Sequence, residues 1–154
     1  MQSNLKRIIG LDVGLRRIGI ALSDPLGITA QGLPTLWRKH MKADLAELSR
    51  LAREHEAGAF VVGHPLHMSG RESRQGHIVQ EFAERLRERS GLPVTLWDER
   101  LTTVVANQVL RESGIGLEKR NKAVDQLSAV LILQSYLDAQ PPADESTWQD
   151  GQQE

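Results

Sequence analysis

Along the N-terminal part of the chain, short apolar runs alternate with turn-forming residues, a pattern typical of β-strands joined by tight connections. The runs cover residues 7–12, 18–23 and 28–37. Gly14 lies in the first connection, and a DPLG turn at 24–27 forms the second. The pattern predicts three consecutive antiparallel strands.

Beyond these strands the apolar positions change to helical spacing, at Met41, Leu45, Leu48 and Ala52. Gly58 is expected to end this helix. The segment 59–63 (AFVVG) is apolar throughout, which is typical of a strand inside a sheet covered by helices on both faces. A second amphipathic helix is expected over 72–90, with an i,i+4 ion pair between Glu81 and Arg85.

A short strand over 93–97 and two helices over 101–113 and 118–138 complete the pattern. The predicted order β-β-β-α-β-α-β-α-α implies an α/β fold, in which a mixed sheet carries helices on both faces. We expect residues 1–140 to form one domain, and the polar segment 141–154, which begins with two prolines, to be disordered.

Composition narrows the functional classes. The 154 residues include no cysteine, which excludes disulfides, zinc–thiolate sites and cysteine nucleophiles. The chain has no apolar stretch long enough for a signal peptide or a membrane span, so we expect a cytoplasmic protein. The formal net charge is −1, so any binding to nucleic acid must depend on local clusters of Arg and Lys.

Acidic residues at the ends of the first and last predicted strands are candidate metal or phosphate sites. Asp12 ends the first strand, where Gly14 allows the backbone to turn sharply or to approach a ligand. The alternative is a turn-forming Asp. Asp98 and Glu99 follow the last strand and, on an extended segment, point to opposite faces. The alternative for this pair is that Asp98 caps the next helix while Glu99 is solvated.

Asp125 lies early in a helix that is apolar almost all round, on the same face as Ala129, Ile132 and Tyr136. A partly buried carboxylate is costly without a partner, and no basic residue follows one turn later. In a mixed sheet, an acid after the first strand, one after the last strand and one in the final helix can converge at one edge. Three such carboxylates suit Mg²⁺ or Mn²⁺, and two ions would promote water attack on a phosphodiester.

Four collinear segments resemble the YqgF-type, or RuvX-type, family of the RNase H-like superfamily. They are LDVGLRRIGIALSD (11–24), VVGHPLHMSG (61–70), DERLTT (98–103) and VDQLSAVLILQSYLD (124–138). Members of this family are described as pre-16S ribosomal RNA nucleases and as Holliday junction resolvases. The resemblance implies a central mixed five-stranded sheet flanked by helices. It also implies an acidic site in which Asp12 and Asp125 match two acids and the Asp98-Glu99 pair matches a third, with Glu99 preferred.

Basic residues flank these acidic segments, namely Arg16, Arg17, Arg71, Arg74, Arg100, Lys119, Arg120 and Lys122. They suit salt-dependent contacts with phosphates, and the alternative is ordinary solvated charge. With three Trp, one Tyr and two Phe, a platform that stacks bases has little support in the composition. His64 and His67, in a loop expected at 64–71, either contact phosphate or transfer protons, or are surface histidines without a role.

We therefore expect a metal-dependent nuclease that acts on structured or single-stranded nucleic acid, foremost in 5′-end maturation of pre-16S rRNA. The ribosomal precursor would then be its partner, no membrane would be involved, and the protein would act as a monomer or a homodimer. Holliday junction resolution or DNA repair is the alternative activity. The Asp-x-Gly hairpin at Asp12 also occurs in actin-like and sugar-kinase-like ATPases. Such an ATPase would need a second phosphate-binding hairpin and a longer, two-lobed chain. A non-catalytic nucleic-acid-binding module is a further alternative, although all three acidic positions are occupied.

Overall fold

The computed structural model describes residues 6–65, 74–98 and 117–140, with the backbone alone described for 117–125. Five strands form one sheet in the order β3-β2-β1-β4-β5. β1 is antiparallel to β2 and β2 to β3, whereas β4 is parallel to β1 and β5 to β4. The strands are β1 (Arg7–Val13), β2 (Arg17–Ser23), β3 (Ala30–Trp37), β4 (Ala57–His64) and β5 (Val94–Asp98).

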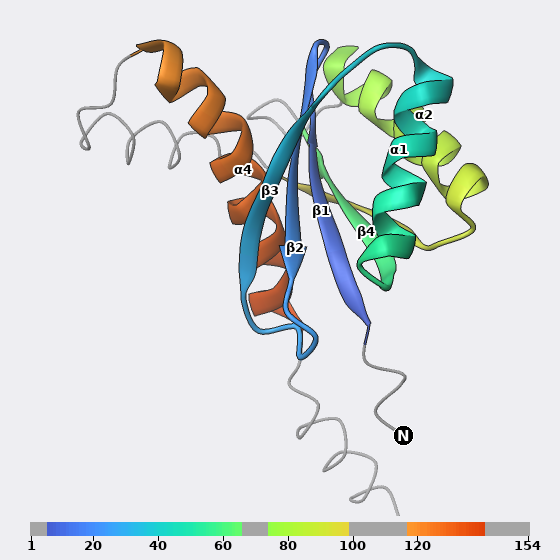
Figure 1. Cartoon of the computed structure of the whole chain (residues 1–154), viewed down its shortest axis with the longest axis vertical. Coiled ribbons are helices and arrows are strands. Elements are labelled where there is room, and N and C mark those ends of the chain that lie inside the picture. The colour runs from blue at the N-terminus through green and yellow to red at the C-terminus, as the bar shows by residue number, and fades with distance from the viewer. Residues whose placement is uncertain (1–5, 66–73, 99–116, 141–154) are drawn as a thin grey trace, which may run out of the picture.

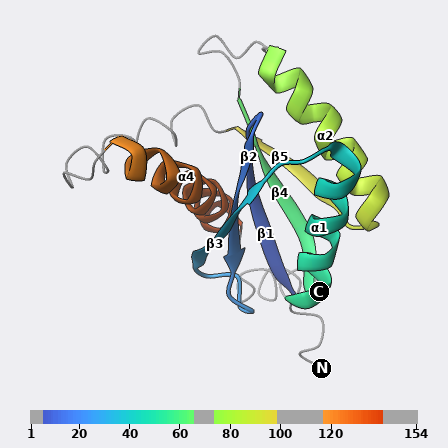
Figure 2. The same cartoon turned by 45° about the horizontal axis from the view of Figure 1, so that its top comes forward.

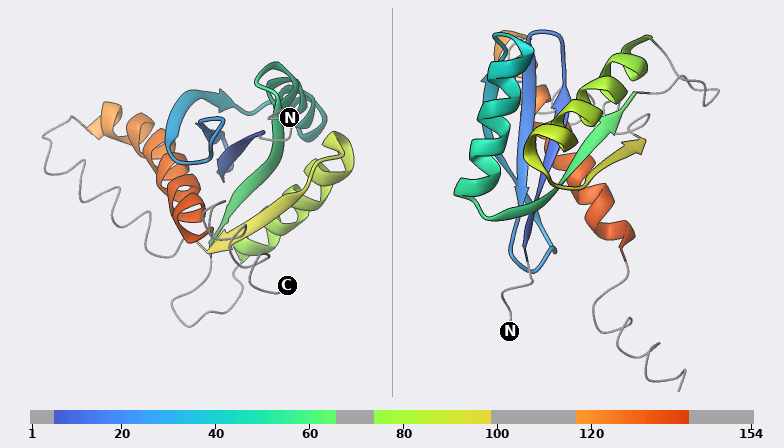
Figure 3. Two further views of the ribbon diagram at one scale, coloured as in Figure 1. Left: turned by 90° about the horizontal axis from the view of Figure 1, so that it is seen from below. Right: turned by 90° about the vertical axis from the view of Figure 1, so that its right-hand side faces the viewer.

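Helices cover both faces of this sheet, which confirms the predicted α/β architecture. Helices α1 (Met41–Glu54) and α2 (Arg74–Ser90) pack on one face, and α4 (Leu117–Ala139) crosses the other (Figure 1). Figure 2 shows β5 beside β4, and the view from below in Figure 3 separates the three layers. Among the helices that the structure describes, none combines the length and the apolar character that a bilayer crossing requires.

The alternation of side chains along the strands creates two hydrophobic cores, one on each face of the sheet. The core under α1 and α2 includes Leu11, Phe60, Val62, Leu48, Phe82 and Leu86. The core under α4 consists of Ala21, Val61, Ala129, Ile132, Leu133 and Leu137. Strand β4 contributes to both cores, which explains why its sequence is apolar on both sides.

Two predicted boundaries, the end of the first helix and the start of the third strand, were wrong, and each is shifted by the local conformation or hydrogen bonds of the backbone. Gly58 does not end the first helix but lies inside β4. The helix ends earlier because Glu56 adopts a left-handed φ of 55°, which lets the chain turn directly into the strand. The third strand begins at Ala30 rather than at residue 28, because the amides of Ile28 and Thr29 donate to Asp24 Oδ1. These bonds, with Thr29 the largest cause, lower the pKa of Asp24.

The predicted ion pair between Glu81 and Arg85 was also wrong, since the structure forms no such salt bridge among the described residues of α2. Arg87 instead pairs with Glu84, at 2.6 Å between Nη2 and Oε1. The Arg85 side chain lies along a groove between α1 and α2.

Helix α4 approaches the sheet closely at Gly10, in the middle of β1. A Cβ atom at Gly10 would lie 2.7 Å from Leu133 Cβ and 3.3 Å from the Ala129 carbonyl oxygen. Two α4 glutamines also bond the backbone of the edge strand β3: Gln126 donates to Leu33 O and Gln134 accepts from Ala30 N. The position of α4 is therefore set by close packing on β1 and by hydrogen bonds to β3.

We expect Gly10→Ala to lower the free energy of unfolding by about 2 kcal/mol, because the added methyl meets atoms that cannot rotate away. Urea denaturation measures this difference. Gly32→Ala is the matched control, because a Cβ there meets the outer atoms of the Gln126 side chain, which is exposed and can rotate away. Equal losses for the two variants would show that α4 is free to shift on the sheet.

Candidate active site at the end of β1

Asp12 lies at the C-terminal end of β1, half-buried and opposite Gly19 of β2. The turn that follows is tight: the Gly14 amide donates to the Arg17 carbonyl oxygen at 2.9 Å. A Cβ at Gly14 would lie 2.8 Å from that same oxygen, so the turn has no room for a larger residue. A tight turn at Gly14 therefore directly follows Asp12.

The alternation of side chains places Asp12 and Asp98 on opposite faces of the sheet. Leu11 and Val13 belong to the core under α1 and α2, so Asp12 between them faces the α4 side, as Gly10 does. In β5, Trp97 faces α4, since its Nε1 donates to Ser135 Oγ at 3.0 Å and its ring meets Tyr136 edge-on at 5.2 Å. Asp98, the next residue, therefore faces the α1–α2 side and is exposed.

Asp125 and Asp12 lie toward the same end of the sheet. Helix α4 runs antiparallel to β1, as its contacts with Gly10 and with β3 require. Asp125 precedes Ala129 by one turn, and Asp12 lies two residues beyond Gly10, the residue against which Ala129 packs. Starting from the contact between Gly10 and Ala129, both Asp12 and Asp125 therefore lie in the direction of the C-terminal end of β1.

The structure places the other predicted site residues unevenly. Arg16 is exposed in the β1–β2 turn, Arg17 begins β2 and Arg74 is exposed at the start of α2. Positions Lys119, Arg120 and Lys122 belong to the first turns of α4, before Asp125. His64 lies half-buried in strand β4 rather than in the expected loop. Outside the described residues lie Glu99, Arg71, Arg100, His67 and the helix expected over 101–113.

Arg38 supports the Asp12 turn and was not identified from the sequence. Its Nη1 donates to the Gly14 carbonyl oxygen at 3.0 Å, and its Nε donates to Asp44 Oδ2 at 2.9 Å. Its guanidinium also lies 5.2 Å from the centre of the Phe82 ring. One side chain thus joins the turn after Asp12 to both α1 and α2. The available signal was Asp44, an acid directly beside the apolar face of a predicted helix.

The described residues show how far a metal site can be identified in this structure. No group of three His, Cys, Asp or Glu side chains gathers anywhere in residues 6–65, 74–98 and 126–140. Of the three predicted ligands, this part of the chain includes the carboxylate of Asp12 only, because the Glu99 and Asp125 side chains lie outside it. A carboxylate oxygen at the end of β1 is a donor of the kind that hard divalent cations prefer.

Comparisons with known proteins bear on the fold and on the family of the chain. Among solved structures, the chain is similar in fold to Thermus thermophilus RuvC in complex with a Holliday junction substrate (TM-score 0.52, 13% identity, covering 86% of this chain and 96% of that chain). The fowlpox virus Holliday junction resolvase is similar (TM-score 0.51, 15% identity, 86% of this chain and 98% of that chain). The sheet order and the layers thus define an RNase H-like α/β fold.

Sequence similarity then identifies the family. A profile of the RuvX family, described as Holliday junction resolvase, matches residues 6–139. A Koribacter versatilis protein named "Putative pre-16S rRNA nuclease" is 54% identical over 132 residues, covering 86% of each chain. A protein of the same name from Moorella thermoacetica is 50% identical over 132 residues, covering 86% of this chain and 94% of its own. The chain belongs to the RuvX family.

Proposed function

We propose that this protein is a nuclease that hydrolyses phosphodiester bonds of RNA, in the maturation of the 5′ end of pre-16S rRNA. The observation that supports it most directly is the position of Asp12, half-buried at the C-terminal end of β1 and followed by a turn that admits only glycine. The substrate class comes from relatives that are about half identical to this chain and are named pre-16S rRNA nucleases.

Asp12, Glu99 and Asp125 are the proposed metal ligands, and Mg²⁺ or Mn²⁺ the proposed ions. Glu99 is favoured over Asp98 because Asp98 faces the side of the sheet opposite to Asp12 and α4. When bound, two such ions would lower the pKa of an attacking water and stabilise the leaving oxygen.

The chain's own residues orient the substrate and hold the acids in place. Gly14 keeps the backbone of the β1–β2 turn tight beside Asp12, and Arg38 fixes that turn through the Gly14 carbonyl. Exposed Arg16 and Arg74 are proposed to contact phosphates, together with Arg17, Arg71, Arg100, Lys119, Arg120 and Lys122. Such contacts bind the sugar-phosphate backbone and carry no direct sequence information, so any sequence preference would come from the shape of the nucleic acid.

Cleavage of four-way DNA junctions is the second candidate, because the family profile carries the description Holliday junction resolvase. Symmetric cutting of a junction requires two active sites, so this activity would need a homodimer. Trimming of rRNA is possible for a monomer.

A matched substrate panel tests both candidates: pre-16S rRNA fragments, single-stranded RNA, single-stranded DNA and a four-way junction, each with Mg²⁺, Mn²⁺ or EDTA. We expect cleavage of the rRNA fragments that EDTA stops and that Asp125→Asn removes. Preferential junction cleavage would replace the first candidate by the second. If no substrate is cut while binding persists, the protein is a non-catalytic nucleic-acid-binding module.

A further inference from the structure

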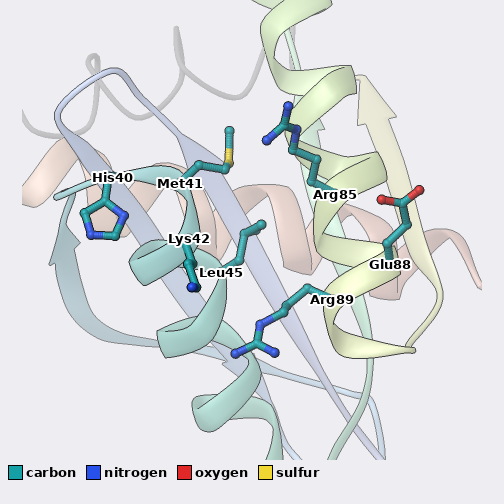
Figure 4. Close-up of a pocket in the computed structure, with 7 residues that line it drawn as sticks. All are labelled: His40, Met41, Lys42, Leu45, Arg85, Glu88 and Arg89. Atoms are coloured by element: carbon teal, nitrogen blue, oxygen red, sulfur yellow. The ribbon is translucent and has the colours of Figure 1, made fainter.

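A groove between α1 and α2 extends from the turn after Asp12 along the outside of these helices. Its main part is lined by His40, Met41, Lys42, Leu45, Arg85 and Arg89 (Figure 4). A second hollow, lined by Leu15, Arg16, Trp37, Lys39 and His40, adjoins it. His40 borders both hollows, so they adjoin each other, and together we call them the basic groove.

Three cations of the basic groove form no salt bridge with any carboxylate that the structure describes. Within the described residues, Lys42, Arg85 and Arg89 take part in no salt bridge. Figure 4 shows the two arginines extending from α2 toward α1. The groove contains two acids: Glu88 on α2, and Asp44, which is already bonded to Arg38.

Two other arginines of these helices, Arg50 on α1 and Arg87 on α2, are paired with glutamates. Arg50 pairs with Glu47 and Glu54, at 2.7 Å in each case, and Arg87 pairs with Glu84 at 2.6 Å. The hydrogen bond from Arg50 is the main cause that lowers the pKa of Glu47. In a chain whose net charge is −1, three cations without a salt bridge in the described part of the chain thus line one hollow, Lys42, Arg85 and Arg89.

An exposed aromatic ring lies at the end of the groove nearest the candidate active site. The Trp37 side chain is 56% exposed, and the Arg17 guanidinium lies 5.5 Å from its ring centre. Leu15, in the same hollow, is 73% exposed. Trp37 and Leu15 thus give this hollow an exposed apolar surface beside its cations, and an exposed ring can stack on a base. The count of aromatic residues argued against a base-stacking platform, but it could not show that Trp37 is exposed beside these cations.

We propose that the basic groove binds a single-stranded segment of the nucleic-acid substrate, which passes from the cleavage site over the β1–β2 turn. Lys42, Arg85 and Arg89 contact its phosphates, and Trp37 stacks on an unpaired base. Arg85 and Arg89, one helical turn apart, lie about 6 Å apart along the axis of α2, so they reach different phosphates. This proposal rests on the proposed nuclease function, because it assigns the path of that enzyme's substrate.

The test measures binding without cleavage, by fluorescence anisotropy of labelled single-stranded RNA in EDTA, over a range of salt concentrations. The groove variant is the full chain with Lys42→Gln, Arg85→Gln and Arg89→Gln. The control variant carries Arg50→Gln, Arg53→Gln and Arg87→Gln, so its net charge changes equally. We expect about tenfold weaker binding for the groove variant, and a salt slope smaller by about 2, since each contact with a single strand contributes about 0.7.

Trp37→Ala tests the stacking contact separately. We expect about fivefold or greater loss of affinity for single-stranded RNA and little change for duplex RNA, whose bases are already stacked. Equal losses on the two forms would overturn the stacking assignment. Equal losses for the groove and control variants, or none for either, would overturn the groove itself.

These outcomes are distinguishable from failure of the proposed function. If the wild-type protein cleaves no substrate but the groove variant loses binding, the nuclease proposal fails and the groove stands as a binding surface. If the wild-type protein cleaves RNA and the groove variant binds like the control, the groove proposal alone is overturned.

Discussion

Asp12→Asn is expected to reduce RNA cleavage about 1,000-fold while leaving the protein folded. Asparagine has the shape of aspartate but lacks the negative charge that would hold a divalent cation. Charge stabilisation by such cations amounts to several kcal/mol, and about 4 kcal/mol corresponds to a factor of about 1,000 in rate. Initial cleavage rates at saturating RNA measure the effect.

Thermal melting in EDTA separates a catalytic role of Asp12 from a structural one. A carboxylate gathered with other acids repels them, so its neutralisation is expected to keep or slightly raise the melting temperature. Asp138→Asn is the matched control, because Asp138 is an exposed acid near the end of α4 that accepts from Gln134. Its cleavage rate should equal that of the wild type. An Asp12→Asn protein that melts early, or that cleaves normally, would contradict the proposed role.

Most of the fold follows from the spacing of apolar residues. The change from period two to helical spacing near Met41 separates the three-stranded meander from the alternating part of the chain, and both were predicted. The fully apolar segment at 59–63 correctly indicated a strand covered on both faces. Boundaries failed where a single residue acts locally, as Glu56 does through its left-handed φ. A non-glycine residue in that conformation has no signature in hydrophobic periodicity.

The position of Asp12 at a strand end followed from the sequence, but the face on which Asp98 lies did not. Strand alternation alone left open which of Asp98 and Glu99 faces the site, and the family resemblance favoured Glu99. The structure adds the face of Asp98, because its neighbour Trp97 packs against α4. Which face of a strand meets which helix depends on tertiary packing, so no local pattern encodes it.

The supporting interactions around the site were missed for a related reason. Arg38 contacts Gly14, Asp44 and Phe82, residues from three different elements. Likewise, Arg85 was assigned to a pair with Glu81 on its own helix, but it lines a groove whose other wall is α1. In both cases the partners lie outside the residue's own helix or strand, from 6 residues away for Asp44 to 24 for Gly14, whereas helical spacing predicts only partners three or four residues away.

Arg38→Ala is expected to lower the free energy of unfolding by about 3 kcal/mol, measured by urea denaturation. Asp44, which is 2% exposed, would keep one hydrogen bond, from the Lys39 amide, but would lose its cationic partner. The Gly14 carbonyl and the face of Phe82 would lose their contacts as well. Arg50→Ala is the control, because Arg50 is 51% exposed and its pairs with Glu47 and Glu54 are surface pairs that solvent screens, so we expect little change in stability.

A double-mutant cycle identifies the source of the loss at Arg38. If the unpaired buried carboxylate dominates, Arg38→Ala combined with Asp44→Ala should be less destabilising than the sum of the single variants, because the double variant leaves no charge behind. Additive losses would instead mean that Arg38 acts through Gly14 and Phe82. In that case the cleavage rate, measured below the melting temperature of each variant, should fall with Arg38→Ala more than with Asp44→Ala. The bond from Arg38 to Gly14 would then hold the turn beside Asp12 by itself.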